Sequence, residues 1–157
     1  MRRKVLWLNL VLALLVINGL IIHKENIKRN GRTVLLETGR ADPRSLMQGD
    51  YMVLRYNLSR AARHVPRGSG HLVIALDNDG LGRFSRVYRG GDLRENEILI
   101  DYKNHDHIKV AAETYFFQEG KASELMGARY AKLKVSESGK TVIIGLLDGD
   151  FKELGRK

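Results

Sequence analysis

The chain has 157 residues, of which 43% are hydrophobic and 29% are charged, a composition that fits one folded domain with an added apolar segment. It contains no cysteine, which excludes thiol catalysis, zinc–thiolate centres, disulfides and iron–sulfur clusters. The formal net charge of +9 is concentrated around the apolar segment in residues 1–32, whereas residues 33–157 are nearly balanced, so nucleic acid is not expected as a partner.

An uncharged apolar run lies near the N-terminus, at residues 5–22, with the sequence VLWLNLVLALLVINGLII. As a helix it would be about 27 Å long, close to the hydrocarbon thickness of a bilayer, and Trp7 lies near one end, where an interfacial aromatic is expected. Apolar residues surround the whole helix, unlike a core helix with one apolar face. No small-x-small cleavage site follows, as a signal peptide would require. We therefore predict a transmembrane helix.

The charges that flank this run predict its orientation. Arg2, Arg3 and Lys4 favour an N-terminus that stays inside, which places the C-terminal domain in the periplasm or otherwise outside the cytoplasm, although the segment after the run is also basic. The expected organisation is a cytoplasmic basic tail at 1–4, a transmembrane helix at 5–22, a basic stalk at 23–32 and one folded domain at 33–157. We expect the helix to run on through Lys28 and to break at Asn30-Gly31.

The rest of the chain shows mainly the patterns of β-strands. The segment after Gly49 alternates, so that Met52, Leu54 and Tyr56 form an inward face and Tyr51, Val53 and Arg55 an outward one. Residues 59–70 are predicted to form a basic surface loop and residues 121–129 the one short helix, with Ala122, Leu125 and Met126 on its apolar face. Strands are predicted at 33–37, 50–58, 71–76, 82–89, 97–103, 108–118, 130–135 and 141–147. About eight strands predict a mainly β fold, an antiparallel sandwich or a small partly open barrel.

A possible metal site involves His105 and His107. Two histidines separated by one residue on a strand point to the same face and can bind a metal. These two lie at a predicted turn, however, and no further ligands are evident. A solvated turn is therefore the favoured interpretation, and we expect neither a metal nor a cofactor.

A possible nucleophile is Ser45, in the turn Asp42-Pro43-Arg44-Ser45 ahead of the alternating strand. This layout is similar to that of type I signal peptidases and related serine–lysine proteases. In those enzymes the serine stands about eight residues before the glycine, where this chain has Ala41, and no lysine is evident as a buried base. A membrane-tethered serine–lysine hydrolase and a small-ligand-binding domain with an aromatic groove stay open as alternatives.

The segment Gly49-Asp50-Tyr51-Met52-Val53-Leu54-Arg55-Tyr56 has the form G-D-Y-x-x-L-x-Y and resembles the motif after which the bacterial GDYXXLXY domain family is named. The preceding LLETGRADPRSLMQ and the later ETYFFQEGKASELMGARYAKLKV also resemble blocks of that family, so the resemblance covers most of the chain. The chain departs from the family pattern at Arg40-Ala41, where Pro-Val is usual, and at Ala131, where glycine is frequent.

The resemblance implies a membrane-anchored protein with no assigned reaction, of a family commonly encoded beside multi-spanning membrane proteins. Because no catalytic constellation is complete, we hypothesise a non-enzymatic accessory domain that contacts membrane lipid through its anchor and binds a multi-spanning membrane protein. The oligomeric state is not predicted. The expected functional surface comprises Asp42, Arg44, Gly49, Asp50, Tyr51, Arg55, Tyr56, Glu113, Tyr115, Glu119, Arg129 and Tyr130.

Overall fold

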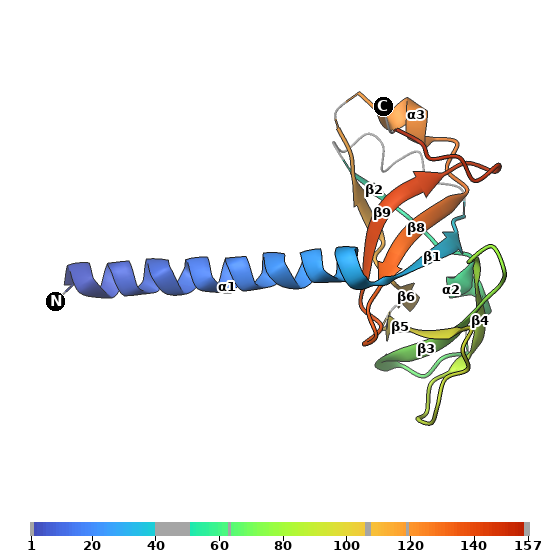
Figure 1. Ribbon diagram of the computed structural model, residues 1–157, viewed down its shortest axis with the longest axis horizontal. Coiled ribbons are helices and arrows are strands. Elements are labelled where there is room, and N and C mark those ends of the chain that lie inside the picture. The colour runs from blue at the N-terminus through green and yellow to red at the C-terminus, as the bar shows by residue number, and fades with distance from the viewer. Residues whose placement is uncertain (1, 40–50, 63, 106–107, 119, 156–157) are drawn as a thin grey trace.

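A computed structural model describes residues 2–39, 51–62, 64–105, 108–118 and 120–155 as one long helix joined to a β-rich domain (Figure 1). In chain order the elements are α1 (Arg2–Asn30), β1 (Arg32–Glu37), β2 (Tyr51–Val53), α2 (Leu58–Ala61), β3 (Gly68–Leu76), β4 (Gly82–Val87), β5 (Glu97–Asn104), β6 (Ile108–Val110), β7 (Thr114–Phe116), α3 (Ala122–Leu125), β8 (Tyr130–Val135) and β9 (Thr141–Leu147).

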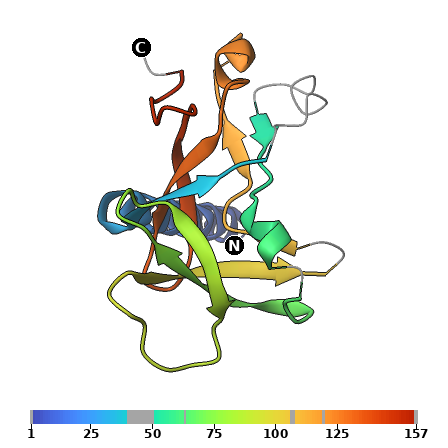
Figure 2. The same ribbon diagram turned by 90° about the vertical axis from the view of Figure 1, so that its right-hand side faces the viewer.

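Helix α1 leaves the domain as an isolated rod (Figure 1). Its segment Leu6–Asn30 is long and apolar enough to cross a membrane, and its most apolar stretch is not buried against the domain. The helix packs on β8 and β9 only through its C-terminal turns, where Ile27 is 4% exposed. In Figure 2, which shows the domain from the side opposite to α1, β4 lies in front and α1 lies behind the domain.

The junction between helix and domain has no flexible linker. Gly31 N donates to Ile27 O (2.8 Å), Lys134 Nζ donates to Gly31 O (2.9 Å), and Arg32 already pairs with Val135 in the first sheet. The predicted end of the helix at Asn30-Gly31 is confirmed, and the basic segment before it is helical. The domain is therefore held in a fixed position at the end of α1.

Two of the three sheets join into one curved arrangement. β1, β8 and β9 form an antiparallel sheet in the order β1-β8-β9, and β2 pairs antiparallel with β7. Hydrogen bonds between the residues at the ends of β1 and β2 link these two strands: Gly39 N donates to Arg55 O (2.6 Å), and Asn57 N donates to Glu37 O (3.0 Å). The resulting order is β9-β8-β1-β2-β7, in which β9 and β7 are not paired with each other. The predicted mainly β, antiparallel and partly open fold is confirmed.

The other sheet, in the order β4-β3-β5-β6, is also antiparallel, and it shares one core with the curved arrangement of β9, β8, β1, β2 and β7. It contacts β1 directly, since Leu35 N donates to Gly80 O (2.9 Å). Burial of apolar side chains between the two layers supplies the main driving force for folding. The most deeply buried large side chains include Val34, Leu36, Met52, Leu54, Leu72, Ile74, Ile100, Leu133 and Leu146.

Outside the motif strand, three details of the sequence prediction are wrong. The expected strand at 108–118 is divided between two sheets as β6 and β7, because Ala111 has a φ of +61° and turns the chain. The expected loop at 59–70 begins with α2, and Ala62 and Val65 are buried in the core. The expected helix at 121–129 is limited to α3, since glycine at position 127 is a poor helix former, and Met126 is 61% exposed.

A buried carboxylate links β4, β5 and the loop between them, and it predicts a pH dependence of stability. The Glu97 side chain is 2% exposed and accepts hydrogen bonds from the Arg86 guanidinium and from Arg94 N (3.1 Å). These bonds hold the pKa of Glu97 below its ordinary value of 4.5, and the bond from Arg86 contributes more than the bond from Arg94. The charged carboxylate therefore stabilises the fold above about pH 4.5, and this contribution is lost as the pH falls through the lower folded-state pKa.

We expect the melting temperature of the full-length protein in mild detergent to fall as the pH is lowered below that value. Glu97→Gln should melt lower than the wild type at pH 7 and show a flatter pH dependence, as followed by circular dichroism. Glu95→Gln is the matched control because Glu95 is exposed. Identical pH profiles for the wild type and Glu97→Gln would contradict this assignment.

Candidate functional site

The alternating motif strand divides into a structural face and an exposed face, as the sequence predicts. Met52, Leu54 and Tyr56 are 0, 1 and 2% exposed and lie in the core, whereas Val53 and Arg55 are exposed. The hydrogen-bonded strand is shorter than expected, since β2 covers only three residues and Tyr56 returns to the sheet through a single bridge to Thr38. The inward residues of the motif therefore build the fold.

Tyr56 has a specific structural role. Its hydroxyl donates to Ala112 O, next to the positive-φ residue Ala111 where the chain passes from β6 to β7. Burial, and after it the negative charge of Glu113, raises the pKa of Tyr56 well above its ordinary value, so the phenol stays neutral and remains a donor. Leu54 N also donates to Glu113 O (2.7 Å). The motif strand thus holds the kink that separates the two sheets.

The outward face of β2 and β7 carries exposed aromatic surface. Tyr51 lies opposite Phe116 in the antiparallel register, and their ring centroids are 6.0 Å apart. Phe116 is 73% exposed and Val53 is 37% exposed, whereas Tyr115 lies on the inward side and packs against the core. Of the predicted functional surface, Tyr51 and Arg55 are accessible here.

Arg129 and Tyr130, just before β8 and at its start, are linked to the motif strand through the backbone. Arg129 O accepts a hydrogen bond from Thr38 N (2.8 Å), and Thr38 is the bridge partner of Tyr56. The Tyr130 ring stacks instead on Phe151, with centroids 4.6 Å apart. The structure therefore brings Tyr51, Tyr56, Glu113 and Tyr115 together and leaves the side chain of Tyr130 in a separate aromatic pair.

Several predicted residues lie outside the described residues: Asp42, Arg44, Ser45, Gly49, Asp50, Glu119 and His107. The serine–lysine hydrolase and the paired-histidine site therefore stay predictions. His105 is exposed at the turn after β5, and within the ranges that the structure describes no group of three or more His, Asp or Glu side chains could hold a metal ion.

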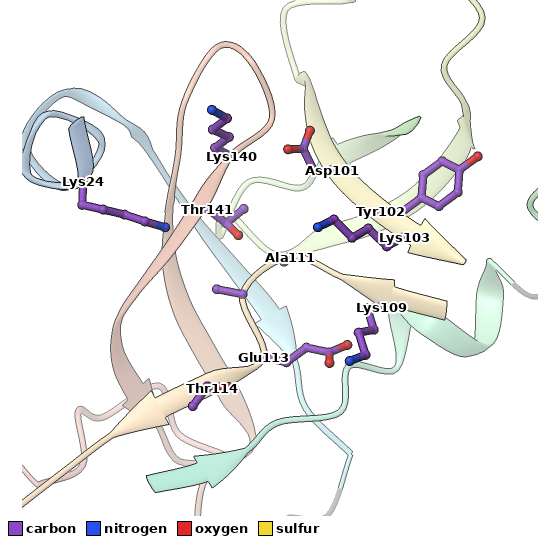
Figure 3. A pocket seen from close by; sticks show the side chains of 11 residues that line it. Lys24, Asp101, Tyr102, Lys103, Lys109, Ala111, Glu113, Thr114, Lys140 and Thr141 are labelled. Carbon is purple, nitrogen blue, oxygen red and sulfur yellow. The ribbon is translucent and has the colours of Figure 1, made fainter. Parts of the chain in front are cut away.

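A cavity that the sequence did not indicate opens between the base of α1 and the domain (Figure 3). Its volume is about 440 Å³, and it is lined by side chains from α1, β5, β6, β7 and the turn between β8 and β9. Four of these are lysines, Lys24, Lys103, Lys109 and Lys140. Only Lys24 had a recognisable signal, its position two residues after the apolar run, because the others meet it through the tertiary fold.

The comparisons with known proteins agree with the motif. The family model described as "GDYXXLXY protein" matches residues 13–146, which is most of the chain. No match was found among curated proteins or among solved structures. The matched region includes the motif strand, the kink that it holds, β8 and all but the last residue of β9. The chain therefore belongs to the GDYXXLXY protein family.

Proposed function

We propose that this protein is a single-pass membrane protein whose C-terminal domain lies outside the cytoplasm and binds a multi-spanning membrane protein as a non-enzymatic accessory subunit. The observation that carries the proposal is the exposure of apolar side chains all round α1: Trp7, Leu8 and Leu20, which point to three different sides of the helix, are 67, 67 and 63% exposed. So much apolar surface is not stable in water, and a lipid bilayer would cover it.

The charges at the start of α1 support the orientation. Arg2, Arg3 and Lys4 precede the apolar segment, and short basic tails are preferentially retained on the cytoplasmic side. The domain follows the other end of the helix and would then lie in the periplasm or an equivalent extracytoplasmic space.

The outward face of β2 and β7 is the best-supported partner surface. The exposed apolar patch consists of Tyr51, Val53 and Phe116. Arg55 follows Val53 by two positions along the chain and is also exposed. Exposed aromatic patches beside an arginine are typical of protein interfaces. Phe116 also lines a small cavity together with Lys24 of α1, so the patch lies beside the base of the helix. A partner that contacts it would lie at the membrane surface, which favours another membrane protein.

Site-specific photocrosslinking tests this proposal. A photoreactive phenylalanine analogue at Phe116 of the full-length protein, expressed in its native membranes, should form an adduct with a multi-spanning membrane protein identified by mass spectrometry. The same analogue at Ser85, an exposed residue of β4 on the other side of the domain, should give no such adduct. Tyr51→Ser should weaken the Phe116 adduct because it removes half of the aromatic pair.

Adducts only with soluble proteins, or equal adducts from Phe116 and Ser85, would contradict the partner assignment. The anchor is tested separately on the same membranes, since an integral protein stays in the pellet after alkaline carbonate extraction.

A further inference from the structure

The cavity at the base of α1 collects positive charge from four separate elements. Lys24 comes from α1, Lys103 from β5, Lys109 from β6 and Lys140 from the turn before β9. In Figure 3, Lys24 and Lys103 extend toward Thr141 from opposite sides. All four lysines are exposed, so their ammonium groups are accessible to a ligand from outside.

Three of these lysines form no salt bridge with a residue that the structure describes. Within the described ranges, Lys24, Lys103 and Lys140 form no ion pair with a carboxylate, whereas Lys109 extends toward Glu113 (Figure 3). The other acidic side chain of the lining, Asp101, faces His71, with Oδ1 and Nε2 3.1 Å apart but without a well-directed hydrogen bond. Ammonium groups that gather on one surface create a positive potential, which attracts anions.

The position of Lys24 indicates where the cavity lies relative to the bilayer. Lys24 follows the last residue of the apolar run, Ile22, by two positions, which is about 3 Å along the helix axis. The headgroup layer of each leaflet is about 5 to 8 Å thick. The domain is joined to α1 between Ile27 and Gly31, and residues of β5, β6 and the turn before β9 line the same cavity as the Lys24 side chain.

We propose that this cavity binds the phosphate of an anionic lipid headgroup. The inference rests on the anchor in the proposed function and adds a ligand and a site to it. Lysine ammonium groups form charge-assisted hydrogen bonds with phosphate oxygens, and the cavity volume of about 440 Å³ lies in the range of small-ligand sites. The lipid would neutralise the lysines and hold the domain against the membrane.

Lipid titration of the full-length protein tests this site. Protein stripped of lipid in detergent is titrated with phosphatidylglycerol, and bound lipid is measured by native mass spectrometry. Lys103→Gln combined with Lys140→Gln should weaken binding at least about tenfold, since each lysine near an anionic surface contributes to the affinity. The control is the double variant Arg83→Gln and Lys152→Gln. Both residues are exposed and lie outside the cavity, so this variant loses the same charge and should bind lipid like the wild type.

Equal losses in the two double variants would overturn the proposal, because the lysines would then act only through net charge. Phosphatidylcholine that binds as tightly as phosphatidylglycerol would also overturn it, and so would inorganic phosphate that binds as tightly, since the ligand would then be free phosphate. Lys140→Gln alone, in an exposed turn, gives a second variant if the double variant does not fold, and it should still weaken lipid binding measurably.

Carbonate extraction of the same variants separates this proposal from the anchor. If the wild type stays in the membrane pellet and phosphatidylglycerol binding is unaffected by the lysine changes, only the lipid site is overturned. If the wild type is extracted, the anchor itself is wrong.

Discussion

Gly31→Ala is expected to destabilise the protein by about 1–3 kcal/mol and to loosen the attachment of α1. A Cβ atom at this position would lie 2.5 Å from Ile27 O, 3.0 Å from Val135 O and 3.1 Å from Val135 N. All three are backbone atoms, so the clash cannot be relieved by rotating a side chain. The helix and the first sheet must move apart, which disrupts the junction that positions the domain.

Denaturant unfolding of the full-length protein in mild detergent measures the change in stability. The matched control is Gly19→Ala in the same helix, where a Cβ atom meets nothing within 4 Å and where alanine is the better helix former. Because the chain has no native cysteine, spin labels at His23 and Ser85 can report the helix–domain distance. We expect Gly31→Ala to broaden that distance distribution and Gly19→Ala to leave it unchanged. Equal behaviour of both variants would show that the junction is not tightly packed.

Tyr56→Phe should cost about 1–3 kcal/mol although it removes only one oxygen atom. The change leaves Ala112 O without its donor at the kink between β6 and β7, beside a residue with positive φ. Urea unfolding at pH 7 measures the effect. Tyr88→Phe is the control, because the Tyr88 hydroxyl donates to Gly91 O (3.0 Å) in an exposed loop, and its loss should cost less than about 0.5 kcal/mol. Similar costs for the two variants would contradict the structural role of Tyr56.

The sequence predicts the parts of this fold that have a local signal. The apolar run and Asn30-Gly31 predict the helix and its end, and the alternation at Met52, Leu54 and Tyr56 predicts the inward face of the motif strand. The kink at Ala111 has no such signal, since neither glycine nor proline stands there. The hydrogen bond from the Tyr56 hydroxyl to the neighbouring Ala112 O is a tertiary contact, which a search for local patterns does not detect.

The two candidate sites also differ in whether a local sequence signal predicts them. The motif points to β2, and the structure shows why its second tyrosine belongs there: it supports the fold, while Tyr51 remains accessible. The lysine cavity combines position 24 with positions 103, 109 and 140, which meet only because β5, β6 and the β8–β9 turn surround the base of α1. Without the topology those lysines are indistinguishable from ordinary surface charges.

The central claim is that α1 crosses a bilayer and holds the domain with its β8–β9 turn at the membrane surface, and depth-dependent fluorescence quenching tests it most directly. In Figure 1 this turn lies beside the end of α1, whereas β4 lies on the opposite side of the domain in Figure 2. A single fluorophore is placed at Glu137 in the turn or at Ser85 in β4, both exposed, and the protein is reconstituted into vesicles that carry a nitroxide on the lipid headgroup. We predict strong quenching at Glu137 and little at Ser85. Equal quenching at the two positions, or none at either, would contradict the account.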